Sequence, residues 1–161
     1  MTPEPRWLDD QERAAWIAFL AASNLVARRL EQQLKDEAGL SHTQYEVLVQ
    51  LSAAEGGSLR MSELADLLVT SKSGLTYQVT QLERAGLVTR RSCPSDVRGV
   101  FAQLTEHGMD VLRRAAPGHV EAVREALIDV LTPEQRYHLA QGLSEVSRRL
   151  RAGARTEAAQ S

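Results

Sequence analysis

Two short strand-like segments around a turn, within residues 87–104, restrict the fold of this chain more than any other feature. Valine occurs in both segments, with threonine in the first and phenylalanine in the second, and a Pro-Ser-Asp turn separates them at residues 94–96. Three arginines lie on the segments beside that turn. The pair follows directly on two helical patterns within residues 61–86. A cationic hairpin placed after a helix–turn–helix pattern is typical of a winged helix–turn–helix.

The helical pattern before this hairpin has two chemically different faces. Ser71 is a good N-cap, and Leu75, Val79 and Leu82 share one face at i, i+4 and i+7. The opposite face and its flanks carry hydroxyl, amide, phenol and guanidinium groups, on Ser73, Thr76, Tyr77, Thr80, Gln81 and Arg84. Such groups suit hydrogen bonding to base edges and phosphates. The sequence therefore predicts a recognition helix over about 71–85 and a wing over about 87–104.

The remaining helical patterns extend beyond a minimal lobe of this kind. An apolar stripe predicts an N-terminal helix over 9–38, and a capping box at Ser41 begins a winged helix–turn–helix lobe over 41–105. Further helices are expected within 106–151, and the Ala-, Gly-, Gln- and Ser-containing residues 152–161 are expected to form a disordered tail. The apolar faces of the N- and C-terminal helices predict a helical dimerisation region. The predicted fold class is mainly α with a small β-wing.

Composition and charge exclude several classes of protein. No apolar run approaches the ~20 residues that span a bilayer, and the first residues lack the basic start and apolar stretch of a signal peptide. The net charge is −2, yet residues 71–98 carry five basic side chains against two acidic ones, a patch that attracts phosphates. The single cysteine, Cys93, excludes an internal disulfide and fits a reducing compartment. We therefore expect a cytoplasmic location.

Several motifs within residues 10–150 resemble those of the MarR (multiple antibiotic resistance regulator) family of transcription factors. They are Met61-Ser62-Glu63-Leu64-Ala65, Ser71-Lys72-Ser73-Gly74-Leu75-Thr76, Leu82-Glu83-Arg84-Ala85-Gly86-Leu87-Val88, Pro94-Ser95-Asp96-Val97-Arg98-Gly99 and Leu104-Thr105-Glu106-His107-Gly108. The resemblance implies a homodimer that places its recognition helices in the major groove and its wings over the minor groove of a near-palindromic operator. It also implies a repressor of its own or neighbouring genes, released from DNA by a small aromatic or anionic effector.

The candidates for contact with double-stranded DNA combine the helix face, the wing and one preceding arginine. They are Arg60, Ser71, Lys72, Ser73, Thr76, Tyr77, Thr80, Gln81, Arg84, Arg90, Arg91 and Arg98. The Arg98 guanidinium is expected to reach the minor groove, whose negative potential attracts a weakly hydrated cation. The resemblance implies that Asp96 orients the wing through an ion pair with an arginine. The alternative is a surface hairpin whose salt bridge contributes about 0–1 kcal/mol.

A predicted effector pocket draws its residues from three helices. They are Trp16, Phe19, His42, Tyr45, Met109, Leu112 and Arg113. A half-buried Arg113 would select carboxylates or phenolates, and plain core packing is the alternative for every member of the set. Cys93 has no second thiol to resolve a sulfenic acid, which argues against a redox role.

No histidine, cysteine or carboxylate spacing completes a metal set, and the sequence has no nucleophile elbow or phosphate loop. The chain is therefore predicted not to be an enzyme and to need no cofactor or metal. Two other functions remain open: a constitutive DNA-binding regulator without an effector, and a winged-helix protein-interaction module. The second should lack the wing arginine and the polar helix face, and both are present here.

Overall fold

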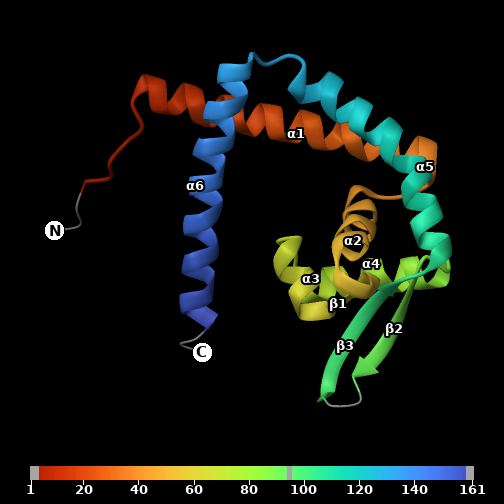
Figure 1. Ribbon diagram of the computed structural model, residues 1–161. Coiled ribbons are helices and arrows are strands. Elements are labelled where there is room, and N and C mark those ends of the chain that lie inside the picture. Colours follow the sequence, from red (N-terminus) through yellow and green to blue (C-terminus); the bar gives the residue numbers. More distant parts are fainter. Residues whose placement is uncertain (1–3, 94–95, 159–161) are drawn as a thin grey trace. The chain divides into compact units, whose positions relative to one another are not determined.

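The helical and strand elements form two compact units, Met1–Ala122 and Val123–Ser161 (Figure 1). The computed structural model describes the backbone of residues 4–93 and 96–158 and the side chains of residues 4–92 and 99–153. No helix within these residues is long and apolar enough to cross a bilayer. The predicted class, mainly helical with a small antiparallel sheet, is confirmed.

Local signals set the ends of the first two helices. Helix α1 (Asp10–Ala38) begins at a capping box in which Asp9 Oδ1 accepts the Glu12 amide at 2.8 Å, and it ends at Gly39, which is left-handed at φ 66°. Helix α2 (His42–Ala53) begins at the predicted capping box, where Ser41 Oγ accepts the Gln44 amide at 3.1 Å. Both helices therefore begin where side-chain oxygens satisfy the first free amides.

The lobe after α2 combines two short helices with a three-stranded sheet. A 3-10 turn, η1 (Glu55–Gly57), leads into β1 (Ser58–Arg60), followed by α3 (Met61–Leu67) and α4 (Lys72–Arg84). The hairpin then follows as β2 (Val88–Cys93) and β3 (Asp96–Leu104). The strand order is β1-β3-β2 with antiparallel pairing throughout. Figure 1 shows the hairpin extending from the lobe as a two-stranded arm.

The core of the first unit is built from aliphatic side chains of its helices and of the sheet. Its most buried members are Leu34, Val47, Leu48, Leu51, Leu64, Leu75, Val79, Leu82 and Val88. Leu112 and Ala115 of α5 (Glu106–Val123) belong to the same core. The sequence predicts residues 106–151 as C-terminal dimerisation helices. In the structure the apolar face of α5 packs into the lobe, and this packing removes Leu112 from water.

One threonine joins the recognition-helix turn to the start of α5. Thr105 Oγ1 donates to the Gly86 carbonyl at 2.8 Å and accepts the Gly108 amide at 3.0 Å. Its own amide donates to the Leu87 carbonyl at 3.1 Å. Gly108 is buried, and a Cβ built there would lie 2.1 Å from the Leu87 carbonyl oxygen. The Leu-Thr-x-x-Gly pattern at residues 104–108 thus has two structural reasons. Thr105 caps α5, and the Leu87 carbonyl approaches Gly108 so closely that only glycine fits.

The second unit contains a π-turn, η2 (Arg124–Ile128), and α6 (Pro133–Ala158). The predicted capping box at its start is present, with Thr132 Oγ1 accepting the Gln135 amide at 3.2 Å. The expectation of a disordered tail from residue 152 is wrong as far as Ala158, because α6 continues through that segment. Alanine, arginine and glutamate there are good helix formers, a preference that a composition-based argument overlooks. Residues 159–161 lie outside the described residues.

Candidate nucleic-acid interface

Helix α4 has the two faces that the sequence predicts. Leu75, Val79 and Leu82 are buried, at most 1% exposed, and attach the helix to the core. Ser73, Thr76 and Arg84 are exposed on the other side. The Tyr77 side chain there is 63% exposed, although its ring is large enough to fill a core position. An unburied aromatic beside hydroxyls and an arginine forms a hydrogen-bonding surface rather than a packing surface.

The N-terminus of α4 is arranged to receive an anion. Ser71 Oγ accepts the Gly74 amide at 3.1 Å and lies 3.3 Å from Ser73 Oγ. Lys72, the first residue of the helix, is exposed. The first turn contains no acidic side chain. The positive end of the helix dipole and the Lys72 ammonium thus act together, a combination that suits a DNA phosphate.

Two threonines on α4 have restricted hydrogen-bonding roles. Thr76 Oγ1 donates to the Lys72 carbonyl and Thr80 Oγ1 donates to the Thr76 carbonyl, both at 2.8 Å. Their hydroxyl protons are therefore engaged within the helix. Toward DNA these side chains offer an acceptor oxygen and a methyl group, which match an exocyclic amine or a thymine methyl.

The structure separates the predicted arginines into two groups. Arg84 on α4 and Arg91 on β2 are exposed. Arg60 is half-buried, with its guanidinium 5.2 Å from the centre of the Phe101 ring. Arg90 is half-buried and pairs with Glu83, with Nη2 2.8 Å from Oε2. The side chains of Arg98, Asp96 and Cys93, which carried the wing and redox predictions, lie outside the described side chains.

A cleft of about 380 Å³ lies between α4, the start of α3 and the base of the wing. Its walls are formed by Arg60, Met61, Ser62, Lys72, Leu75, Thr76, Arg90, Gly99 and Val100. Three of these side chains are cationic. The cleft therefore adds positive potential beside the N-terminus of α4.

The turn between α3 and α4 contains a residue that the sequence analysis did not single out. Val69 has a positive φ of 52°, a conformation that costs a β-branched residue about 1–3 kcal/mol, and it is 73% exposed. The turn lets the Thr70 amide reach the Ala65 carbonyl at 3.1 Å and so end α3. An exposed isopropyl group three residues before Lys72 is a further candidate for apolar contact with DNA.

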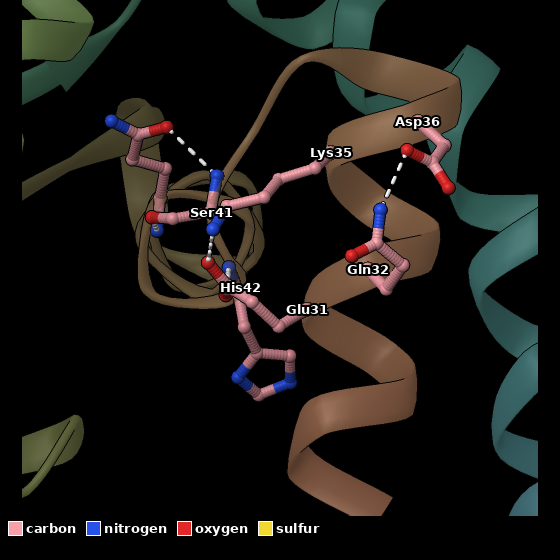
Figure 2. Close-up of polar contacts among 7 residues, drawn as sticks. Glu31, Gln32, Lys35, Asp36, Ser41 and His42 are labelled. Atoms are coloured by element: carbon pink, nitrogen blue, oxygen red, sulfur yellow. Dashed lines mark hydrogen bonds and ion pairs between the residues drawn. The ribbon is translucent and has the colours of Figure 1, made fainter.

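An acidic side chain of the long N-terminal helix, α1, accepts a hydrogen bond from the first turn of α2. Figure 2 shows the Glu31 carboxylate of α1 at the first turn of α2, where Oε2 accepts the His42 amide at 2.7 Å. Lys35 pairs with the same carboxylate at 2.9 Å. The His42 amide, followed by Lys35, lowers the pKa of Glu31. A charged carboxylate stabilises a helix N-terminus. Glu31 therefore holds the first turn of α2 against α1.

A buried histidine joins α5 to both of these helices. His119 is 6% exposed, and its Nδ1 lies 3.1 Å from Gln33 Oε1 on α1. The Gln33 amide in turn donates to Glu37 Oε2 at 2.8 Å. The His119 ring centre lies 4.3 Å from that of Tyr45 and 5.7 Å from that of His42 on α2. Sequence reasoning missed His119, since an isolated histidine in a helix has no spacing signal.

The residues of the predicted effector pocket are not brought together in this chain. Tyr45, Leu112 and Met109 pack in or against the core, and only His42 and Tyr45 contact the His119 cluster. Trp16 and Phe19 stack on each other, 52% and 43% exposed. They lie more than ten residues along α1 from Glu31, roughly 20 Å at 1.5 Å per residue. Arg113, which would select an anion if it were half-buried, is exposed and paired with Asp110 at 3.4 Å.

The buried His119 predicts a pH-dependent stability. Burial, followed by the neighbouring His42 charge, lowers the pKa of His119 below its usual 6.5, and Glu46 opposes this shift. The folded state then binds a proton less readily than the unfolded chain. This contribution to stability is present above about pH 6.5 and is lost as the pH falls through the folded-state pKa. We expect the midpoint of urea denaturation to fall between pH 7.5 and 5.5.

His119→Gln serves as the control for that measurement, because an amide keeps the hydrogen bond to Gln33 and does not titrate. Its denaturation midpoint should depend less on pH over the same range. An equal fall in both proteins would assign the effect to other groups.

The exposed polar face of α4, its cationic N-terminus and the hairpin beside it define a winged-helix DNA-binding protein. The model of the MarR family matches residues 40–100. Two solved structures extend the likeness to most of the chain. Sco3205, a MarR family transcriptional regulator from Streptomyces coelicolor in complex with DNA, is 44% identical over 91% of each chain, with a TM-score of 0.87.

AbsC, another MarR family regulator from Streptomyces coelicolor, is 44% identical over 92% of this chain and 99% of its own, also with a TM-score of 0.87. The transcriptional repressor MprA of Escherichia coli K12 is 34% identical over 79 residues, 49% of this chain and 45% of its own length. The chain thus belongs to the MarR family. It is a DNA-binding transcriptional regulator and not an enzyme.

Proposed function

We propose that this protein is a homodimeric, cytoplasmic repressor that binds a near-palindromic operator upstream of its own or a neighbouring gene. The observation that carries the proposal is the exposed polar face of α4, with Tyr77 63% exposed at its centre. Repression is supported by the likeness to MprA, which is named a repressor. The cytoplasmic location follows from the proposed role, because a bacterial operator lies on DNA in the cytoplasm.

The homodimer is supported by apolar side chains that the chain leaves exposed on its long terminal helices. On α1 these include Trp16, Ile17, Phe19 and Leu20, and on α6 Leu139, Leu143, Val146 and Leu150. Exposed apolar stripes of this length mark a surface that another chain covers. Two copies related by a two-fold axis would present two recognition helices to two half-sites.

Release by a small aromatic or anionic effector is the second part of the proposal. At the junction of α1, α2 and α5 the half-buried His42 lies beside the buried rings of Tyr45 and His119, and the chemistry of these groups suits such a molecule. A constitutive regulator without an effector is the alternative. The test is a thermal-shift screen of aromatic acids and phenols, in which a bound effector raises the melting temperature of the protein. A screen in which no compound raises the melting temperature would favour the constitutive regulator.

The experiment that tests operator binding is a gel-shift titration on the upstream intergenic DNA in the presence of unrelated competitor. We expect Tyr77→Ala to weaken binding by about tenfold or more without lowering the melting temperature, because the side chain is largely exposed and a lost base contact costs about 1–3 kcal/mol. Arg98→Ala should have an effect of similar size. Lys72→Ala should weaken binding on all sequences and reduce the salt slope by about one.

Arg114→Ala, an exposed arginine on α5, is the matched control and should bind like the wild type apart from a small general charge effect. Equal binding of wild-type protein to any DNA would contradict sequence-specific regulation and would favour the protein-interaction module. Full affinity in Tyr77→Ala would remove the α4 face from the proposed interface.

A further inference from the structure

The turn of the chain from α4 into the wing is bridged by one acid–arginine pair. Arg90 on β2 donates through Nε and Nη2 to Glu83 Oε2, at 3.1 and 2.8 Å. The Arg90 backbone amide donates to the other oxygen, Oε1, at 3.2 Å. Both carboxylate oxygens are therefore engaged by the same residue of the wing. Side-chain and backbone hydrogen bonds from Arg90 together lower the pKa of Glu83.

This pair connects the two elements that a winged helix presents to DNA. Glu83 lies in the last turn of α4, and Arg90 is the third residue of β2. Between them the Leu87 amide donates to the Leu82 carbonyl at 2.9 Å, which tightens the turn. Both side chains are about one-third exposed, at 37% for Glu83 and 31% for Arg90. Partial burial and three hydrogen bonds favour one fixed geometry over a mobile surface pair.

The charge pattern of α4 makes Glu83 conspicuous. Glu83 is the one acidic residue in α4, and every other charged residue there is basic. A free carboxylate next to a DNA-facing surface would repel phosphates. Its presence is explained if the carboxylate acts on the wing rather than on DNA. Arg90 correspondingly directs two of its side-chain donors to the protein, whereas the sequence analysis placed it among the candidates for DNA contact.

We propose that Glu83 is a positioning residue for DNA binding, which through Arg90 holds the wing at a fixed angle to the recognition helix. Arg90 then forms one wall of the cleft with Lys72 and Thr76 because Glu83 keeps it there. The inference rests on the proposed function, in which both α4 and the wing contact the operator. The new claim is that α4 and the wing can contact the operator at the same time only while Glu83 is paired with Arg90.

The test uses the double variant Glu83→Gln with Arg90→Gln in the full-length protein, which leaves the net charge unchanged. The first measurement is amide hydrogen exchange without DNA. Exchange at Thr89 and Arg91, on either side of the substituted position, should accelerate about fivefold or more, while the buried α4 residues Leu75 and Val79 stay protected. Unchanged exchange in β2 would overturn the proposed restraint on the wing.

The second measurement is binding to a duplex that the wild-type protein selects from a random pool. We expect the double variant to bind at least fivefold more weakly, with hydroxyl-radical protection lost at the flanks of the site and kept at its centre. Glu83→Gln alone distinguishes the two roles by sign. Loss of a repulsive charge would strengthen binding, whereas loss of a positioning contact weakens it.

The matched control is Asp110→Asn with Arg113→Gln, which removes an exposed ion pair of the same unit at the same net charge. This control should bind and exchange like the wild type. Double-variant binding within twofold of wild type would overturn the inference. Failure of the wild-type protein to select any duplex would instead contradict the proposed function, and the exchange measurement would then decide the role of Glu83 alone.

Discussion

Gly108→Ala is expected to destabilise the protein by about 3 kcal/mol, because its new methyl group has no room. The added Cβ would lie 2.1 Å from the Leu87 carbonyl oxygen and 2.8 Å from Leu104 Cδ1. The first of these atoms is backbone and is held by the Thr105 amide, so it cannot rotate away as a side chain would. Relief requires α5 to move from the sheet. Urea denaturation followed by circular dichroism measures the loss.

Gly153→Ala is the control for this prediction. Gly153 lies within α6, and a Cβ there would meet no atom of the described residues within 4 Å. Alanine is the better helix former by about 1 kcal/mol, so the denaturation midpoint should stay constant or rise slightly. A Gly108→Ala protein as stable as the wild type would show that α5 is not packed on Leu87 as described.

Leu143→Glu together with Leu150→Glu is expected to convert the protein to a monomer and to lower operator affinity about a hundredfold or more. The two leucines lie on one face of α6 and are 38% and 70% exposed in the single chain. Charges on that face would oppose burial against a second copy. A monomer binds one half-site at a time and loses the effective concentration that linkage provides, a factor of roughly 10²–10⁴. Sedimentation velocity and gel-shift titration measure the two effects.

Gln141→Glu with Ser144→Glu adds the same two charges to the opposite side of α6, where both residues are exposed. This variant should remain a dimer and keep its affinity apart from a small loss from general repulsion. If the leucine variant sedimented like the wild type, the exposed stripe of α6 would not be the dimer surface.

Much of the candidate site could be predicted from α4 alone. A helix period of 3.6 residues places Leu75, Val79 and Leu82 inside and Tyr77 outside, and the structure confirms both. Ser71 could be identified as the cap because capping depends on residues within one turn. The same local reasoning could not show that the Thr76 and Thr80 hydroxyl protons are used within the helix, since either hydroxyl could equally have faced outward.

The sequence does not show which neighbours another element brings to a side chain. Arg113 was assigned to a pocket by its helix alone, and its exposure depends on which face of α5 meets the core. His119 lies on the face that is buried, and its partner Gln33 is 86 residues away in sequence. No periodic pattern encodes such a distant contact.

By itself the sequence determined the helices, the hairpin and the polar face of α4, because caps, turn residues and periodicity act within a few residues. The tertiary structure alone decided that α5 packs with the lobe, that Glu83 engages Arg90 and that His119 is buried among α1, α2 and α5. These arrangements depend on how apolar faces combine to exclude water. Once they combine, each polar group brought along must find a hydrogen-bonding partner from whichever element lies next to it.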